Sequence, residues 1–443
     1  MIVEITGLGT NGEGVGRHDN LTVFVEGALP NEKILSEVTQ TKKNYAVAKL
    51  VKILRESSDR VKPFCPIYAE CGGCQLQHLN YAAQIKWKRQ QIIDAVERIG
   101  KLKDVEIFDT IGMENPLRYR NKMQFPVARV NSELEIGCYA RGSHKIVDTN
   151  FCMIQREGMD DVLTAVKKIL RKYNVSAYDE DTHRGILRHV MSRIGFNGEL
   201  MIVIVTATKN LSNEKNIVNA IRHELPKVTS IQQNIQTYHN NVILGRETKI
   251  LYGKPTIKDR IGNLTFNISA RSFFQVNTAQ AKVLYEVAKN FAELDGRETV
   301  IDAYCGIGTI TLFLAKAARK VYGIEIVPTA IDDAKKNARE NKIHNAEFIT
   351  GDAVKIIPRL YREGVRADVV IVDPPRAGCD KKVLETFAAM NPTKIVYVSC
   401  NPATLARDLA ILTELGYTTK KIQPVDMFPF SSHIESVTLL EKS

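Results

Sequence analysis

Apolar runs alternate with segments of helical spacing in the last third of the chain. The runs read TVIDAYC, KVYGIEI, AEFITGD, ADVVIVD, KIVYVSC and SVTLLEK. Near-continuous apolar runs separated by amphipathic helices are typical of a parallel sheet that is covered on both faces. The pattern therefore predicts a doubly wound α/β domain over residues 291–443.

The first two thirds of the chain have a different pattern of apolar and polar residues. Residues 1–57 show short apolar alternations with glycine turns, which predict a small β-barrel or another small β-module. Residues 58–80 have no clean period and contain three cysteines. Residues 81–290 begin with an amphipathic helix and then mix strand-like and helical runs, so they predict a central α+β domain.

Length and charge narrow the class of protein. A chain of 443 residues has room for two or three domains, and its formal net charge of +11 favours a polyanionic partner, nucleic acid ahead of a membrane surface. No apolar run approaches the roughly 18 residues needed to cross a bilayer, and the N-terminus lacks a signal-peptide pattern. We therefore expect a cytoplasmic protein with no membrane partner, whose eight cysteines do not form disulfides.

Carboxylates stand at the ends of four predicted strands, where ligands bind in such sheets. They are Asp302, Glu325, Asp352 and Asp373. Gly306-x-Gly308 follows the first strand, but the full dinucleotide motif is absent because position 311 is Thr. One acid after a strand commonly caps the next helix. Four in register favour a sulfonium nucleoside, S-adenosylmethionine (SAM), over a nucleotide pyrophosphate.

A thiol also stands at a strand end, in the stretch IVYVSCNPATLARD (395–408). Cys400 follows the apolar run directly, and Asn401-Pro402 ends the strand. A single cysteine at such a place is commonly a buried structural residue. Its acidic neighbours favour a nucleophile, and for that role we expect surroundings that lower the pKa of the thiol.

Several motifs together resemble a known family. DAYCGIGT, GIEIV, DPPRAG, YVSCNPATLARD and HIESVTLLEK occur in this order, with YRNKMQF and SFFQVN upstream. The chain resembles the SAM-dependent RNA uracil-5-methyltransferases over essentially its whole length. The resemblance implies a Rossmann-like class I SAM methyltransferase domain, an N-terminal OB-like TRAM barrel that binds RNA, and a central RNA-binding domain.

The resemblance also implies a mechanism. Uracil C5 is a poor nucleophile until a thiolate adds to C6, and a base must then remove the C5 proton. Cys400 matches the nucleophile and Glu435 the base, with His433 a competitor for the second role. Asp373 matches the residue that holds the uracil and borders the SAM site. Arg376 stands where enzymes that methylate exocyclic amino groups carry an aromatic residue after D-P-P.

Contacts with SAM and RNA can be carried over by position. The cofactor-binding candidates are Gln275, Tyr304, Gly306, Gly308, Thr309, Glu325, Asp352 and Asp373. Phe273 is expected to stack on the target base, and one of the pair Phe273 and Phe274 is expected to pack in the core. Phosphate contacts are expected from Arg118, Arg120 and Lys122, and also from Arg141, His144 and Lys145. Each of these charges could equally be a solvated surface group.

Three cysteines near the start have the spacing of metal ligands. Cys65, Cys71 and Cys74 need a fourth ligand, for which Cys138 and Cys152 are the nearest candidates. Zinc and an iron–sulfur cluster both suit four thiolates. The resemblance selects a [4Fe-4S] cluster with Cys152 as fourth ligand, and leaves Cys138, Cys305 and Cys379 as structural residues.

Two RNA substrates are candidates within the family. The cysteine pattern resembles the branch that methylates 23S ribosomal RNA, and the target uridine must be unpaired or flipped out of the stack. The alternative is the tRNA uridine methyltransferases, which typically lack the barrel and the cluster. A third reading is a non-catalytic RNA-binding iron–sulfur protein. We expect a monomer.

Overall fold

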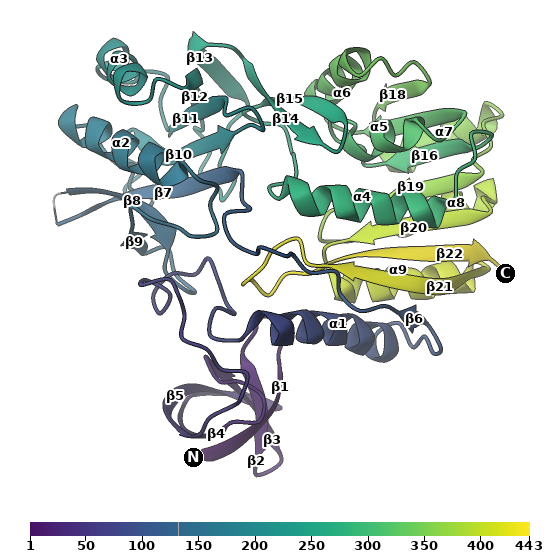
Figure 1. Cartoon of the computed structure of the whole chain (residues 1–443), viewed down its shortest axis with the longest axis horizontal. Helices are drawn as coiled ribbons and strands as arrows, with labels where there is room; N and C mark the ends of the chain where they lie inside the picture. Colours follow the sequence, from purple (N-terminus) through teal and green to yellow (C-terminus); the bar gives the residue numbers. More distant parts are fainter. Residues whose placement is uncertain (132) are drawn as a thin grey trace.

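The computed structural model describes residues 1–131 and 133–443. In chain order it contains a β-barrel, a central sheet with two helices, and a large C-terminal sheet between helices (Figure 1). Residues 56–80 link the barrel to helix α1 (Tyr81–Arg98) without a regular element. This arrangement confirms the predicted fold class, with a small barrel before mixed α/β structure.

The N-terminal barrel is closed in the order β1-β2-β3-β5-β4. Its strands are β1 (Ile2–Leu8), β2 (Gly14–His18), β3 (Leu21–Glu26), β4 (Lys33–Thr41) and β5 (Tyr45–Arg55). Alternate residues such as Val3, Ile5, Val23 and Val25 are buried inside, which matches the two-residue period read from the sequence. Closure leaves the barrel without an unpaired edge.

The central sheet has the order β13-β12-β11-β10-β7-β8-β9. Its strands are β7 (Lys122–Val130), β8 (Glu133–Tyr139), β9 (Ile146–Asp148), β10 (Leu187–Ile194), β11 (Leu200–Thr206), β12 (Val228–Ile235) and β13 (Glu247–Gly253). Helices α2 (Met159–Lys172) and α3 (Glu214–Glu224) pack on it through a shared apolar core. The hairpin β14 (Thr256–Ile261) and β15 (Leu264–Ser269) then leads toward the C-terminal sheet.

The C-terminal sheet has the order β18-β17-β16-β19-β20-β22-β21-β6. Its strands are β16 (Thr299–Ala303), β17 (Lys320–Glu325), β18 (Ala346–Thr350), β19 (Val369–Val372), β20 (Lys394–Ser399), β21 (Tyr417–Val425) and β22 (Glu435–Lys442), with the short β6 (Glu106–Ile107) at one edge. The first five run parallel, whereas β22 is antiparallel and is inserted between β20 and β21.

Helices cover both faces of this sheet, as predicted. One apolar core includes α4 (Thr278–Ala292), α5 (Thr309–Ala315) and α6 (Pro328–Glu340). The core on the other face includes α7 (Ala353–Arg362), α8 (Lys381–Met390) and α9 (Pro402–Glu414). Among the helices of the described ranges, none has the length and apolar character needed to span a bilayer.

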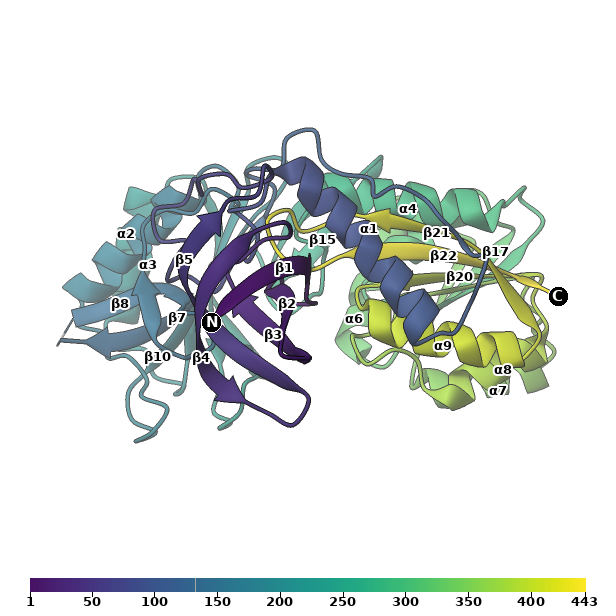
Figure 2. The same ribbon diagram turned by 90° about the horizontal axis from the view of Figure 1, so that it is seen from below.

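Two helices lie on a different domain from the one predicted. The sequence pattern placed α1 and α4 in a central domain over residues 81–290, but both pack against the C-terminal sheet (Figure 2). Ile92 and Val96 of α1 share an apolar core with Leu405 and Leu409 of α9. The helical periodicity of the apolar residues predicted each helix correctly, but this periodicity does not determine which surface the helix packs against.

Two adjacent phenylalanines test this assignment of core and surface. Phe274 is 1% exposed and lies 5.7 Å from the Phe266 ring, whereas Phe273 is 71% exposed. We expect Phe274→Ala to lower the free energy of unfolding by about 3–5 kcal/mol, because it leaves a cavity. Phe273→Ala should change it by no more than about 0.5 kcal/mol. Urea unfolding followed by circular dichroism measures both, and equal losses would contradict the assignment.

Candidate active site

Strand pairing brings the predicted nucleophile and base together. In the antiparallel pair β20–β22, Ser399 lies opposite Ser436 and Val398 opposite Val437. The next position in this register sets Cys400, which follows β20, opposite Glu435, which begins β22. Two residues far apart in the sequence therefore meet at the carboxyl end of a parallel strand.

The four acids gather at the same end of the sheet. Asp373 follows β19, whose last residue Val372 pairs with Ala303 of β16 and Tyr397 of β20. Asp302 is fully buried within β16, and Thr311 donates a hydrogen bond to its Oδ2. Burial, with Asp373 and Glu325 nearby, raises the pKa of Asp302 to about 7. The predicted acidic rim is present, and buried Asp302 Oδ1 has no hydrogen-bond partner among the described residues.

The surroundings of Cys400 do not activate the free thiol. Burial raises the pKa of Cys400 to about 11, and the carboxylates of Glu435 and Asp373 add to the increase. Arg376 is the nearby cation that opposes them. The expectation of a lowered pKa is therefore wrong for the protein without its ligands, because the acidic rim repels a thiolate.

The pKa shifts of Glu435 and His433 both favour the uncharged form of the side chain at neutral pH. Glu435 is 6% exposed, and burial together with the Asp373 charge raises its pKa well above the ordinary range. Burial and the cations Arg376, Lys88 and Arg120 lower the pKa of His433 to about 4. Arg376 Nη2 lies 3.3 Å from His433 Nε2, which suits a neutral imidazole that accepts a hydrogen bond. A carboxylate with a raised pKa is the stronger base of the two.

The predicted cofactor residues surround the first two strand ends. Gly306, Gly308 and Tyr304 all have positive φ, at 55°, 83° and 66°, so the chain turns sharply after β16. Glu325 accepts hydrogen bonds from the backbone N–H groups of Gly306 and Val327, at 3.1 and 2.9 Å, which fixes its carboxylate at the rim.

The remaining cofactor candidates lie around these turns. Asp352 caps α7 by accepting from Val354 N at 3.0 Å, so it also performs the ordinary capping role. Thr309 accepts a hydrogen bond from the Tyr285 hydroxyl at 3.1 Å. Gln275 is buried and accepts a hydrogen bond from Asn121 at its carbonyl oxygen, so the SFFQVN stretch is fixed against the central sheet.

A cavity of about 900 Å³ adjoins the active-site end of the sheet. Phe273, Gln275, Arg376 and His433 line it, as do Arg120 and Lys122. Burial, with Arg193 and Arg120 nearby, lowers the pKa of Lys122 to about 7. The predicted stacking residue and two of the predicted phosphate contacts therefore share one cavity with His433.

Three other candidates for phosphate contacts are engaged within the protein. Arg118 Nη1 donates to Asp160 Oδ2 at 2.7 Å and to the carbonyl of Cys152 at 3.0 Å. Arg141 donates to Glu26 Oε1 at 2.6 Å and to the carbonyls of Cys71, Tyr68 and Cys74. His144 Nδ1 lies 2.8 Å from Glu180. The two arginines stabilise the cysteine segments, and their contact with phosphate stays a prediction, whereas Lys145 is exposed.

The cysteines of the first 152 residues line the same 900 Å³ cavity. They are Cys65, Cys71, Cys74, Cys138 and Cys152. A hydrogen bond with Cys138 lowers the pKa of Cys71 to about 6, and Gly73 N donates to Cys71 Sγ at 3.3 Å. Burial and the other cysteines raise the pKa of Cys74 to about 12. In residues 1–131 and 133–443, no three His, Cys, Asp or Glu side chains are arranged to hold a metal ion.

A second opening reaches Cys400 from the barrel. It is a groove of about 1360 Å³ between the barrel, α1 and the start of α9. Arg17 and Phe24 of the barrel line it, together with Trp87 of α1 and with Arg376 and Cys400. The groove thus joins the barrel surface that carries Arg17 and Phe24 to the thiol.

Sequence reasoning missed three residues of this region. Arg376 faces both openings and Cys400, but the sequence showed it only as the residue that follows D-P-P. Cys138 was assigned a structural role, yet it contacts Cys71 in the cavity. Trp87, the single tryptophan of the chain, gave no signal beyond its place in an amphipathic helix.

The fold and its rim define the class of protein. The sheet order, with an antiparallel strand inserted beside the last parallel one and acids at the strand ends, is that of a class I SAM-dependent methyltransferase. Residues 80–443 match the tRNA (uracil-5-)-methyltransferase family, and residues 1–51 match the TRAM domain. The chain belongs to this family of SAM-dependent RNA uracil-5 methyltransferases.

Relatives match over nearly the whole chain. An "uncharacterized RNA methyltransferase" of Clostridium tetani is 51% identical, covering 98% of this chain and 95% of its own length. Another from Halalkalibacterium halodurans is also 51% identical, covering 99% and 97%. The crystal structure of Pyrococcus abyssi tRNA (uracil-54, C5)-methyltransferase in complex with S-adenosyl-L-homocysteine is similar, with 28% identity, a TM-score of 0.78, and coverage of 99% and 100%.

The charges around Cys400 predict opposite effects of two substitutions on its reactivity. Asp373→Asn removes a negative charge and should lower the pKa of Cys400 from about 11, whereas Arg376→Met removes the opposing cation and should raise it. Iodoacetamide labelling of the Cys400 peptide, followed by mass spectrometry across the alkaline range in which the protein stays folded, measures the thiolate fraction. Shifts in the same direction would contradict the assignment.

Proposed function

We propose that this protein methylates C5 of specific uridines in 23S ribosomal RNA, with Cys400 as nucleophile and Glu435 as base. The observation that carries the proposal is the β20–β22 register, which sets Cys400 opposite Glu435 beside Asp373. A binding module has no use for a thiol, a buried carboxyl and an acidic rim at one strand end. The arrangement suits a reaction that needs a nucleophile and a base on the same ring.

The reaction divides between these groups. The Cys400 thiolate adds to uracil C6, and the electron pair of the C5=C6 bond is delocalised toward O4, which makes C5 nucleophilic. SAM, when bound at the acidic rim, supplies an electrophilic methyl group to C5. Glu435 then takes the C5 proton, the C5=C6 bond re-forms, and the C6–S bond breaks to release the thiolate.

The raised pKa values of Cys400 and Glu435 determine which proton must leave before each step. Cys400 with a pKa of about 11 is a thiol at neutral pH, so its proton must leave before addition. Arg376 and any cation at the rim favour the thiolate. Glu435 must likewise be ionised before it can take the C5 proton, and its pKa, raised by burial and by Asp373, makes the carboxylate a stronger base.

The two openings support RNA binding on either side of the thiol. Phe273, Arg120 and Lys122 line the cavity, and Arg17, Phe24 and Trp87 line the groove. Aromatic side chains stack on unpaired bases, and arginine and lysine contact phosphates. A uridine flipped out of its stack could reach Cys400 while its neighbours occupy these surfaces.

Transfer RNA is the second candidate substrate. The Pyrococcus abyssi tRNA enzyme aligns over 99% of this chain and 100% of its own, so the barrel does not separate the two substrates as the sequence reasoning expected. The 23S assignment rests on the resemblance of the cysteine pattern. A direct comparison of the two RNAs must therefore decide it.

Covalent trapping tests the function and the substrate together. Fluorine at C5 cannot be removed as a proton, so SAM and RNA that contains 5-fluorouridine should leave the protein joined to RNA on a denaturing gel. Cys400→Ala should abolish the adduct, whereas Cys379→Ala should retain it. Fragments of 23S RNA should be trapped faster than tRNA. A faster tRNA reaction would overturn the substrate, and no adduct with either RNA would overturn the mechanism.

We propose further that Cys65, Cys71, Cys74 and Cys152 hold a [4Fe-4S] cluster. The type of donor suits such a cluster, because these four thiols line one cavity and the pKa of Cys71 is lowered to about 6, although the described side chains are not yet arranged around a metal ion. Methylation transfers no electrons, so the cluster would stabilise the segments that carry these cysteines. Cys138 would remain beside it as a fifth thiol.

Anaerobic purification tests the cluster. The protein should contain about four iron and four sulfide per chain and absorb broadly in the visible range. Cys152→Ser should lose the iron, whereas Cys138→Ser, a matched change at a thiol of the same cavity, should keep it. Stoichiometric zinc without sulfide, or retention of iron by Cys152→Ser, would contradict this ligand set.

A further inference from the structure

The loop over residues 426–434 stands between the two openings. It joins β21 to β22 and is closed by the pair Val425–Glu435, so it leads directly into the proposed base. Phe428, Ser431 and His433 line the 900 Å³ cavity, and His433 also lines the groove that contains Cys400. The position of this loop therefore sets the wall that RNA would contact and the first residue of β22.

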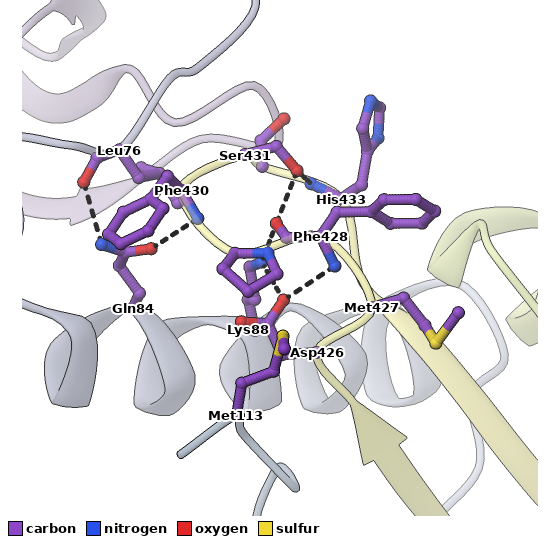
Figure 3. Close-up of polar contacts among 12 residues, drawn as sticks. Leu76, Gln84, Lys88, Met113, Asp426, Met427, Phe428, Phe430, Ser431 and His433 are labelled. Atoms are coloured by element: carbon purple, nitrogen blue, oxygen red, sulfur yellow. Dashed lines mark hydrogen bonds and ion pairs between the residues drawn. The ribbon is translucent and has the colours of Figure 1, made fainter. Parts of the chain in front are cut away.

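A buried ion pair fixes the start of the loop (Figure 3). Lys88 of α1 donates to Asp426 Oδ1 at 2.6 Å and to the carbonyl of Phe428 at 3.0 Å. Both charged side chains are 0% exposed. Asp426 also accepts from the Tyr81 hydroxyl at 2.9 Å and from Phe428 N at 3.2 Å. One ammonium group thus holds a side chain and a backbone carbonyl of the same loop.

The rest of the loop is held by its backbone. Phe430, which has a positive φ of 66°, donates its N–H to Gln84 Oε1 at 3.1 Å. Its carbonyl accepts from Gln75 N and Leu76 N at 3.0 and 2.9 Å, next to Cys74. Asn277 donates to the carbonyl of Met427 at 3.0 Å. Helix α1 and the cysteine segment together therefore determine the shape of the loop.

The buried Lys88–Asp426 pair contributes fixed geometry more than stability. Two charges taken out of water gain little net stability compared with apolar side chains of the same volume. What a buried pair provides instead is direction, because the ammonium must meet its acceptors at fixed distances. Among the described residues that line the cavity and the groove, Lys88 does not occur, so it does not contact RNA there.

We propose that Lys88 is a positioning residue for removal of the C5 proton, an inference that rests on the proposed function. The loop that it holds aligns Glu435 with uracil C5. In that step Glu435 takes the proton, the C–H electron pair becomes the C5=C6 bond, and the C6–S bond breaks with its electrons returning to Cys400. Cys400 itself follows β20 and precedes α9, outside the loop, so addition to C6 depends less on Lys88.

Accumulation of the covalent intermediate tests the inference. With ordinary uridine RNA and SAM, Lys88→Met should release methylated RNA roughly tenfold to a hundredfold more slowly, in keeping with a catalytic group displaced by about 1 Å. The protein–RNA adduct should accumulate on a denaturing gel, as expected for Glu435→Gln. The kcat/KM for SAM should change by less than about threefold, because it reports only the steps up to methyl transfer, whereas kcat and the KM for SAM should fall together. Lys88→Arg, which keeps the charge, should restore part of the release rate.

Two controls separate positioning from stability. The double variant Lys88→Met/Asp426→Asn leaves no unpaired buried charge, so it should fold and still accumulate adduct. Lys167→Met removes a comparably buried lysine of α2, which donates to Asp148 at 2.8 Å, far from the loop in the sequence. It should lower the melting temperature without any accumulation.

The outcomes distinguish the two proposals. If the unaltered protein forms no adduct with 5-fluorouridine RNA, the proposed function fails. Suppose instead that the unaltered protein does form the 5-fluorouridine adduct. If the ratio of adduct formation to product release on ordinary RNA is then the same in the double variant as in the unaltered protein, the positioning role of Lys88 fails. A proportional loss of both steps in the double variant would likewise overturn it, because that result indicates a structural role alone.

Discussion

The pairing of β22 between β20 and β21 is the constraint on which the site depends. Alternate residues of a strand face opposite sides of a sheet, so a slip of one residue would turn Glu435 away from Cys400. The register is well determined, because Val437 and Leu439 face one apolar core while Leu440 faces the other. The same contacts that bury the sheet thus set the meeting of the thiol and the carboxyl.

The acidic rim follows from this placement and carries an electrostatic cost. Asp302 and Glu435 each lie near Asp373 in a buried environment, and the pKa values of all three are raised. Like charges in such a site favour protonated forms over a full set of carboxylates. A rim of this kind attracts a cationic ligand and disfavours a phosphate, which agrees with the family's use of a sulfonium.

The C-terminal domain could be predicted from the sequence because its signals are local. Apolar runs gave the strands, and the acids that follow them gave the rim, since the carboxyl ends of parallel strands share an edge. Signals that depend on tertiary partners could not be read. Arg118 and Arg141 look like exposed RNA contacts until Asp160 and Glu26 are seen to face them. The packing of α1 and the side on which Phe273 lies were equally open.

The raised pKa of Cys400 is compatible with the proposed role of this thiol as nucleophile. A thiol held neutral by carboxylates is protected from oxidation and from unproductive reaction while the site is without its ligands. A positive charge bound at the rim offsets the repulsion from Asp373 and lowers the free energy of the thiolate. Nucleophilic character would then appear only when the methyl donor is in place. Under the proposed function, the surroundings that raise the pKa of this thiol in the free protein would thus make its reactivity depend on the cosubstrate.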